Sequence, residues 1–436
     1  MIPGPFSPIT FGPLTLRNRF IKAASNEGMA PGGVPSKMLV EFHRRVAAGG
    51  AAMTTVAYCA VTPDGRTFPD QICLNDETIP HLKVLTNAVH AAGGKACAQI
   101  THGGAFNFLP VLSTRWPMSA SSGFNAAGMM VLRPFRRAMT EKELRDTAQH
   151  FANAARRAEA AGFDAVEIHM GHGYLLSQFL SPRYNSRTDA WGGDAQRRAA
   201  YPAQVLRAVL DAVGEHLAVL CKFSMVERVD SKARPDELHD SIILARALEK
   251  EGAHLLVLSA GMNVESPWQI FGSRLPAAVS DTVENPVMRI GARLARLFEP
   301  KIEYQSLYLA AQAAQIRAAV NLPLAYLGGV DSLAAAQAPL DAGFDCLALA
   351  RVLLHEPDLI NQWQQGMRSD SGCNHCNECV PTIYHPGGTH CVLNGANDLE
   401  MNRLPALSPL PGGEGARQDH SIPWPCPATW TCCSRY

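Results

Sequence analysis

Three short stretches, AAGFDAVEI (160–168), KEGAHLLVL (250–258) and DAGFDCLAL (341–349), share one arrangement of residues. Each stretch begins with the end of a helical segment, passes through a glycine and a short turn, and ends in an apolar run. A glycine suits the left-handed residue that closes a helix before the chain returns to a strand. The three stretches therefore indicate a repeated unit in which a helix is followed by a strand that is apolar on both faces.

The same unit can be followed along most of the chain. Short apolar runs alternate with segments of helical periodicity, and eight of these runs are expected to be strands. The expected strands are residues 19–25, 52–58, 95–101, 165–169, 218–224, 254–260, 323–328 and 345–350. Eight such units predict an α/β fold of the TIM barrel type, (β/α)8. A doubly wound open sheet is the alternative, but the G-x-G-x-x-G turn that normally follows its first strand is absent from the sequence.

Residues 140–160 illustrate the helical segments. Apolar side chains recur there at alternating steps of four and three, from Leu144 to Ala158, which places them on one face of a helix. Thr140 is followed three residues later by Glu143, the pattern of a capping box at a helix N-terminus. We therefore expect this helix to begin directly after Thr140.

Composition and charge narrow the class of protein. The chain has 436 residues, of which 39 are Lys or Arg and 39 are Asp or Glu, so its formal net charge is zero. Because there is no basic excess, we expect no nucleic-acid partner. No apolar stretch approaches the roughly 18 residues that span a bilayer, and the first residues lack the pattern of a signal peptide. We expect a soluble, cytoplasmic protein that acts on a small-molecule substrate and has no membrane partner.

The composition changes after the last expected strand. We expect the barrel to occupy residues 1–367 and a cysteine-rich segment to occupy residues 368–395. Residues 396–436 are rich in proline and show little periodicity, so we expect a disordered tail there. Five cysteines in apolar runs are expected to be small buried side chains. These five are Cys59, Cys73, Cys97, Cys221 and Cys346.

Two histidines follow the fourth expected strand, at the strand end where a barrel of this kind carries its chemistry. The strand continues into EIHMGHGY (167–174), which contains His169 and His172. Two histidines three residues apart, flanked by glycines, can face one small site. They can equally cap the strand or satisfy buried carbonyl groups. A zinc pair is the third interpretation, but no further ligand follows at a suitable spacing.

The longer segment HMGHGYLLSQFLSPRYNSRTDAWGG (169–193) resembles the signature of the old yellow enzyme-type NADH:flavin oxidoreductases, and the resemblance extends over roughly residues 5–365. Members of this family hold FMN in a (β/α)8 barrel. The resemblance implies that His169 and His172 hydrogen-bond the carbonyl oxygen of an electron-poor substrate and that Tyr174 delivers a proton. Two donors on that oxygen would polarise the carbonyl, so that its conjugated carbon accepts hydride more readily.

The resemblance also implies which residues contact the flavin ring. Lys222, near the end of the fifth strand, occupies the position of a cation near flavin N1, where positive charge stabilises the anionic reduced flavin. Gln99, on the third strand, matches a glutamine that pairs with the pyrimidine edge. Each of these two residues can also be read as an ordinary polar side chain. Residues Ala23, Ala24 and Ser25 lie in the stretch that runs along the isoalloxazine.

The phosphate end of the cofactor site can be read from the residues themselves. Gly328 and Gly329 follow the seventh strand, and Ala350 and Arg351 end the eighth. Barrels of this class commonly bind phosphate with the loops after these two strands. Glycines let backbone N–H groups approach an anion, and arginine adds a charged fork. A Gly-Gly pair alone is more often only a turn, but the paired placement favours a phosphate site.

Several positions depart from the family pattern. The family's H-x-G-R sequence after the third strand appears here as HGGA (102–105), so an arginine is missing. Ala350 replaces a common glycine, Ala24 replaces a common small residue or proline, and Asn26 stands where some relatives carry a cysteine or threonine. These departures bear on the redox potential of the flavin and on the substrate range more than on flavin binding.

Four cysteines follow the barrel with the spacing Cys373-x2-Cys376-x2-Cys379-x11-Cys391. Four thiolates at this spacing suit a 4Fe-4S cluster or a structural zinc ion. The spacing is similar to that of the iron–sulfur branch of the family, which includes trimethylamine dehydrogenase and 2,4-dienoyl-CoA reductase. In that branch the cluster passes electrons between FMN and a second nucleotide-binding domain; because about 45 residues follow Cys391 here, we expect no such domain. Free thiols are the third interpretation.

The leading hypothesis is therefore an FMN-dependent oxidoreductase that takes electrons from NADH or NADPH and reduces an α,β-unsaturated carbonyl or a similar electrophile by ping-pong hydride transfer. A second hypothesis is a flavin and iron–sulfur dehydrogenase or demethylase that passes electrons to a partner protein. From different classes, a zinc hydrolase would use the histidines as ligands, and a zinc-stapled barrel would be non-catalytic. The choice between NADH and NADPH, the substrate and the oligomeric state are left open.

Overall fold

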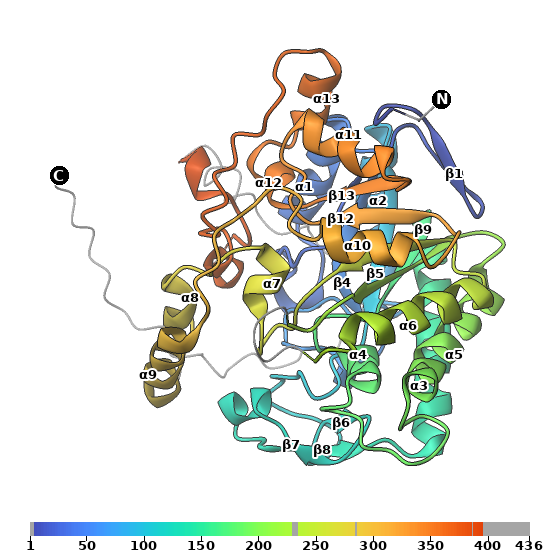
Figure 1. Cartoon of the computed structure of the whole chain (residues 1–436), viewed down its shortest axis with the longest axis vertical. Helices are drawn as coiled ribbons and strands as arrows, with labels where there is room; N and C mark the ends of the chain where they lie inside the picture. The colour runs from blue at the N-terminus through green and yellow to red at the C-terminus, as the bar shows by residue number, and fades with distance from the viewer. Residues whose placement is uncertain (1–3, 229–233, 284–285, 386, 396–436) are drawn as a thin grey trace.

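The computed structural model describes residues 4–228, 234–283, 286–385 and 387–395. Its eight parallel strands form a closed barrel, which confirms the predicted fold class (Figure 1). The barrel strands are β3 (Phe20–Lys22), β4 (Met53–Ala60), β5 (Lys95–Thr101), β9 (Ala165–His169), β10 (Ala218–Ser224), β11 (Leu255–Ser259), β12 (Leu324–Leu327) and β13 (Cys346–Leu349). All eight expected strands are present. The tail expected at 396–436 lies outside the described residues.

The strands follow one another around the barrel in the order β10-β11-β12-β13-β3-β4-β5-β9. Pairing of β13 with β3, with Leu347 opposite Phe20, joins the last barrel strand of the chain to the first barrel strand. Because all strands run parallel, their carboxyl ends meet at one rim. The residues that follow the strands are therefore brought together there.

Helices surround the barrel, and α3, α5 and α6 pack side by side on one flank (Figure 1). The helices are α1 (Lys37–Ala48), α2 (Ile79–Ala91), α3 (Glu141–Ala160), α4 (Leu175–Leu180), α5 (Ala195–Val213), α6 (Glu237–Glu251), α7 (Pro267–Phe271), α8 (Ala278–Asp281), α9 (Pro286–Ala295), α10 (Ala310–Arg317), α11 (Leu333–Asp341), α12 (Arg351–His355) and α13 (Leu359–Gln364). Short 3-10 turns lie at Pro31–Gly33, Pro63–Gly65, Ala127–Val131, Arg296–Phe298, Pro381–Tyr384 and Val392–Asn394.

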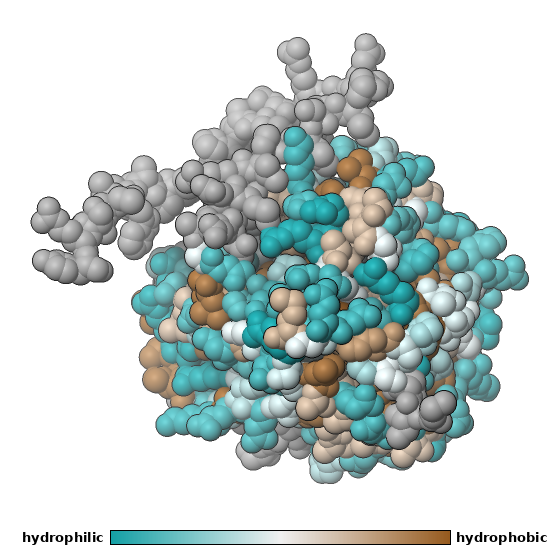
Figure 2. Space-filling view, turned by 90° about the horizontal axis from the view of Figure 1, so that it is seen from above, coloured by the Kyte–Doolittle hydropathy of each residue, from teal (hydrophilic) through white to brown (hydrophobic). Residues whose placement is uncertain are grey.

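The outer surface carries both hydrophilic and hydrophobic residues. Hydrophilic and hydrophobic residues are interspersed over the face that Figure 2 shows. Within the described ranges, no helix is both long enough and apolar enough to cross a bilayer.

Two small sheets were not predicted. The hairpin of β1 (Ile9–Phe11) and β2 (Leu14–Leu16) packs with residues of the barrel interior in one buried cluster. A three-stranded sheet of β6 (Met118–Ser119), β7 (Gly123–Phe124) and β8 (Phe135–Ala138) lies at the bottom of Figure 1, beyond the barrel. Strands of two to four residues carry too little alternation to be recognised in a sequence.

The repeated glycines have the predicted conformation. Gly162, Gly252 and Gly343 have φ angles of 82°, 95° and 88°, in the left-handed region. A side chain at these positions would be strained, which explains the shared glycine of the three stretches.

Four of the five cysteines expected in the core are buried, namely Cys59, Cys97, Cys221 and Cys346. The expectation for Cys73 was wrong, because this residue is only partly buried. It lies after β4 and forms an isolated bridge with Ala60 instead of occupying a barrel strand.

The cysteine-rich segment packs against the barrel. Leu333 N donates to Ser369 O, and Ser332 forms an isolated bridge with Asp370. At its far end, Thr389 N donates to Glu27 O at 2.7 Å, so the segment reaches the loop after β3. Figure 1 shows the segment beside α12.

The capping box gives a direct test of a local prediction that the structure confirms. Thr140 Oγ1 accepts a hydrogen bond from Glu143 N, and the Glu143 carboxylate accepts one from Thr140 N at 2.8 Å. Thr140→Ala should lower the free energy of unfolding by about 1 kcal/mol, measured by chemical denaturation, because the backbone N–H of Glu143 loses its hydrogen-bond acceptor. Thr140→Ser keeps the acceptor and should cost much less. Equal stability of the Ala and Ser variants would contradict this role.

Candidate active site

The rim at the carboxyl ends of the strands gathers most of the predicted site residues. His169 is the last residue of β9 and lies in register with Lys222 on β10. Gln99 lies on β5, in register with Glu167 of β9. Strand β11 adds Ser259 to the same rim. These residues come from four consecutive positions around the barrel, because β5, β9, β10 and β11 are neighbours.

His169, His172 and Tyr174 lie together. The ring of His169 is 4.9 Å from the ring of His172 and 4.7 Å from that of Tyr174, measured between centroids, and both contacts are edge-to-face. The three side chains are buried. The structure therefore brings the predicted catalytic residues into one cluster.

His169 is positioned as a neutral hydrogen-bond donor. Its Nδ1 accepts a hydrogen bond from Gly171 N at 3.2 Å, so the ring proton belongs on Nε2. Burial lowers the pKa of His169 well below its ordinary value, and the neighbouring His172 and Lys222 lower it further. The ring therefore stays uncharged at neutral pH and retains one N–H to offer to a ligand.

His172 is held by two serine side chains, those of Ser224 and Ser259. Its Nε2 lies 2.8 Å from Ser259 Oγ, and its backbone N donates to Ser224 Oγ at 3.0 Å. Its φ angle of 58° is uncommon for a residue with a side chain, and such conformations persist where surrounding contacts hold them. Burial, followed by the charge of Lys222, lowers the pKa of His172 well below its ordinary value. The contact with Ser259 leaves Nδ1 as the ring atom for a ligand.

Tyr174 is a protonated hydroxyl in a buried setting. Burial raises its pKa to about 12, although hydrogen bonds with Tyr58 and Asn263 act in the opposite direction. The rings of Tyr58 and Tyr174 are 5.2 Å apart, and Tyr58 OH lies 2.7 Å from Thr67 Oγ1. Sequence reasoning missed Tyr58 and Asn263, which lie far from Tyr174 along the chain.

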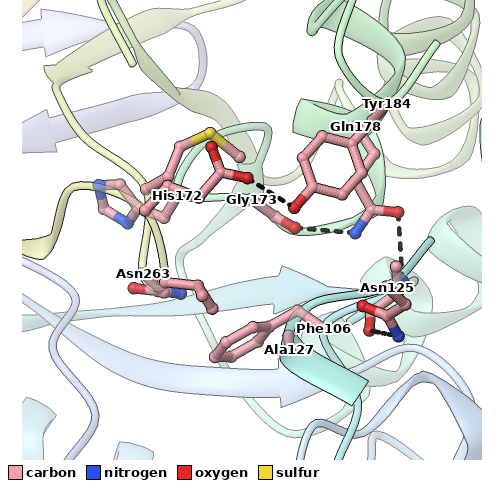
Figure 3. A pocket seen from close by; sticks show the side chains of 12 residues that line it. Phe106, Asn125, Ala127, His172, Gly173, Gln178, Tyr184 and Asn263 are labelled. Carbon is pink, nitrogen blue, oxygen red and sulfur yellow. Dashed lines mark hydrogen bonds between the residues drawn. The ribbon is translucent and has the colours of Figure 1, made fainter. Parts of the chain in front are cut away.

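A pocket opens beside this cluster (Figure 3). Its lining includes His172, Phe106, Met262 and Asn263, so apolar surfaces face a few polar groups. Gln178 links two segments of the pocket lining. Its Nε2 donates to Gly173 O at 2.8 Å, and its Oε1 accepts from Ala105 N at 3.2 Å (Figure 3). Such a lining suits a small organic ligand held next to the histidines.

Another wall of the pocket carries charge. Tyr184 OH donates to Glu265 Oε1 at 3.0 Å (Figure 3), and Arg183 forms an ion pair with the same carboxylate. Because Glu265 is paired in this way, its charge is largely compensated. This wall was also missed: Arg183 and Tyr184 lie within the segment 169–193 but were given no role there, and Glu265 lies in a loop that carries no readable motif.

The predicted flavin-ring residues present buried polar groups at the rim. Lys222 Nζ donates to Ala24 O at 3.3 Å, and burial lowers the pKa of Lys222 while Glu167 raises it. Gln99 Nε2 donates to Glu167 Oε1 at 2.7 Å. The amide oxygen of Gln99 has no partner among the described residues, so it remains as an acceptor for the N–H group of a ligand.

The predicted phosphate residues end neighbouring strands, because β12 pairs with β13. Gly328 and Gly329 have φ angles of 134° and 83°. A Cβ added to Gly329 would lie 2.7 Å from Leu307 N and 3.1 Å from a ring atom of Tyr308, so only glycine fits at this position. Arg351 Nη2 donates to Phe271 O at 2.8 Å, and Nη1 donates to Asn377. Three of the five guanidinium N–H groups remain for an anion. Together with the cation and the amide oxygen at the rim, these groups fit FMN.

The four cysteines of the C-terminal segment do not form a metal site in the described part of the chain. There, no three His, Cys, Asp or Glu side chains lie together as ligands for an ion. Cys373 Sγ lies 3.8 Å from His375 Nδ1, and Cys376 is exposed. Burial raises the pKa of Cys379 to about 12; Arg351 lowers it, and the three other thiols raise it slightly. The iron–sulfur or zinc site therefore stays a prediction.

Comparison with known proteins places the chain among oxidoreductases. A sequence profile of the NADH:flavin oxidoreductase / NADH oxidase family matches residues 5–291. The chain is 40% identical over 411 residues to 4,4'-dithiodibutanoate disulfide reductase of Rhodococcus erythropolis, covering 93% of this chain and 98% of that protein. It is 31% identical over 312 residues to an NADH oxidase of Thermoanaerobacter brockii, covering 69% of this chain and 47% of that protein.

The fold is also similar to a solved structure, that of an old yellow enzyme homologue from Zymomonas mobilis. The TM-score is 0.64 at 23% identity, with 86% of this chain and 96% of that structure covered. The chain thus spans nearly all of the disulfide reductase and about half of the NADH oxidase.

The neutral state of the two site histidines can be measured directly. Nitrogen NMR of histidine-labelled protein should show no titration of His169 or His172 between pH 5.5 and about 8, since burial holds both pKa values well below the ordinary value of about 6.5. Signals would be assigned with His169→Gln and His172→Gln. A midpoint near 6.5 for either site histidine would contradict the neutral-donor geometry.

Proposed function

The chain belongs to the NADH:flavin oxidoreductase / NADH oxidase family, which includes the old yellow enzymes, and we propose that it reduces the carbon–carbon double bond of an α,β-unsaturated carbonyl compound. Members of the family use FMN with NADH or NADPH, and this chain is an NAD(P)H-dependent flavin oxidoreductase. When bound, FMN supplies the hydride that NAD(P)H has delivered to it. The observation that carries the proposal is the cluster of His169, His172 and Tyr174 beside an organic-ligand pocket.

The two histidines would bind the carbonyl oxygen of the acceptor. His169 offers the Nε2 proton of a neutral ring, and His172, held by Ser259, offers Nδ1. Negative charge develops on the carbonyl oxygen as hydride reaches the conjugated carbon. Donors already aimed at that oxygen lower the barrier by several kcal/mol, because they need no reorganisation during the reaction.

Tyr174 would complete the reduction by protonating the carbon next to the carbonyl. Its pKa of about 12 keeps the phenol protonated at neutral pH. One hydride and this one proton convert the double bond to a single bond, so atoms and charge balance. The hydrogen bonds with Tyr58 and Asn263 stabilise the phenolate that is left, until solvent returns the proton.

A second candidate substrate is an organic disulfide. The observation that favours it is the 40% identity to 4,4'-dithiodibutanoate disulfide reductase over 98% of that protein. Hydride addition to a disulfide breaks the S–S bond and yields one thiol and one thiolate, and Tyr174 would supply the second proton. The same pocket serves both candidates, since each acceptor needs an apolar wall and a nearby acid.

Three hypotheses that the sequence raised depend on a bound metal. Electron transfer to a partner protein requires the iron–sulfur cluster, and both the partner and the cluster stay predictions. A zinc-stapled, non-catalytic barrel and a zinc hydrolase disagree with membership of a flavin oxidoreductase family. The cytoplasmic location also stays a prediction.

Replacing Tyr174 separates the two halves of the cycle. Tyr174→Phe should leave reduction by NAD(P)H within a few-fold, because that step uses no proton from the tyrosine. It should slow the reaction of the reduced enzyme with an enone such as cyclohexenone by about 10²–10⁴-fold, the range for loss of a general acid. Stopped-flow absorbance of the flavin under anaerobic conditions measures both steps.

Tyr184→Phe is the matched control, because Tyr184 lines the same pocket but hydrogen-bonds Glu265 instead of the catalytic cluster. It should change neither step more than a few-fold. The measurement is repeated with an organic disulfide in place of the enone. Faster reaction with the disulfide would identify the second candidate, and reaction with neither would refute both.

The phosphate assignment is tested by Arg351→Ala. Loss of a charge-assisted contact should weaken FMN binding by roughly 1.5–3 kcal/mol, measured by fluorescence titration of the flavin-free protein. Riboflavin has no phosphate, so its affinity should change little. Arg207→Ala, which removes an exposed arginine paired with Glu251, is the control. Equal affinity of wild type and Arg351→Ala for FMN would contradict the assignment.

A further inference from the structure

Asn377 is a buried residue in the middle of the cysteine-rich segment. Its side chain is 1% exposed and its φ angle is 62°, although it directly follows the exposed Cys376. Its Nδ2 donates to Ser273 Oγ at 2.9 Å and to Arg274 O at 3.2 Å. Both amide protons are therefore used, and the amide oxygen has to face the opposite way.

The oxygen of Asn377 faces Arg351. Arg351 Nη1 donates to Asn377 Oδ1, while Nη2 donates to Phe271 O at 2.8 Å. The rings of Phe271 and Tyr304 lie 5.9 Å and 5.6 Å from the guanidinium carbon. The guanidinium is thus held from several sides, and Asn377 is the only side chain outside the barrel that accepts a hydrogen bond from it within the described residues.

Both acceptors that hold Arg351 are neutral. An amide and a backbone carbonyl orient the guanidinium without neutralising it, whereas a carboxylate in the same place would compete with an anionic ligand. His375 approaches from the same segment and stacks on Tyr304 with 3.6 Å between centroids.

We propose that Asn377 is a positioning residue that orients Arg351 toward the phosphate of the flavin, which makes the cysteine-rich segment part of the cofactor site. This inference rests on the proposed phosphate role of Arg351. Hydrogen bonds to Ser273 and Arg274 fix the amide group of Asn377. Its oxygen, which accepts from Arg351 Nη1, therefore holds the guanidinium in one orientation. A preoriented arginine loses less side-chain freedom when it binds an anion, so affinity for phosphate rises.

The same segment contacts the other predicted end of the cofactor site. Thr389 N donates to Glu27 O at 2.7 Å, and Thr389 Oγ1 donates to Asn26 O at 2.8 Å. Glu27 is in turn buried, with its carboxylate paired with Lys22 and accepting from Ala57 N at 3.1 Å. The segment therefore spans from the phosphate end to the stretch after β3.

The test compares FMN with riboflavin, because only FMN carries the phosphate. Affinities are measured by fluorescence titration of the full chain after its flavin has been removed. Asn377→Ala should weaken FMN binding about 10-fold, a loss in the range of interaction energies between contacting residues, and should leave riboflavin binding within about two-fold. A residue with only a structural role would weaken both flavins equally, and that result would overturn the proposal.

Two further variants make the test decisive. Asn377→Ala combined with Arg351→Ala should bind FMN no more weakly than Arg351→Ala alone, because Asn377 acts through that arginine. Ser273→Ala removes one anchor of the Asn377 amide and should weaken FMN binding a few-fold with riboflavin unchanged. It serves as the test if Asn377→Ala does not fold, and unchanged FMN affinity would then refute the proposal.

The outcomes separate this inference from the proposed function. If Arg351→Ala lowers the preference for FMN over riboflavin and neither Asn377→Ala nor Ser273→Ala does so, the phosphate assignment stands and the positioning role fails. If Arg351→Ala itself leaves the preference unchanged, the phosphate assignment fails, and the role of Asn377 fails with it.

Discussion

In a closed barrel of parallel strands, all strand ends of one polarity meet at a single rim, and side chains from distant parts of the sequence are buried there together. Burial disfavours charge, whatever the residue type. It lowers the pKa of His169 and His172 and raises that of Tyr174. All three groups are therefore neutral and carry a proton to donate. One physical cause thus prepares both the hydrogen-bond donors and the acid of the proposed reaction.

The fold could be predicted because its signal is repeated. Each strand is an apolar run, and the glycines that precede β9, β11 and β13 adopt the left-handed conformation that the sequence implies. The three catalytic candidates could be predicted because they lie close together in the sequence, within six residues at the end of one strand. Their clustering follows from local spacing, and in the structure the ring of His169 contacts those of both His172 and Tyr174.

The partners of these residues could not be predicted, because their contacts join distant segments. Ser259 holds His172 from two strands away around the barrel, and Tyr58 and Asn263 reach Tyr174 from different loops. Asn377 lies beyond the last strand and between two of the cysteines, whose spacing is the recognisable motif of that segment. A lone serine or asparagine carries no periodicity, so only the folded chain shows what it orients. The C-terminal segment is thereby tied to the barrel rim instead of standing apart from it.

The central claim is that one rim holds the flavin, the acceptor and the proton donor in a single geometry. A crystal structure of the full chain with FMN and a bound phenol, which mimics the enone oxygen, tests it most directly. The account predicts the FMN phosphate against Gly329 and Arg351, and the phenol oxygen within hydrogen-bond distance of His169 Nε2 and His172 Nδ1. FMN phosphate bound elsewhere, or a phenol oxygen directed away from both histidines, would contradict it.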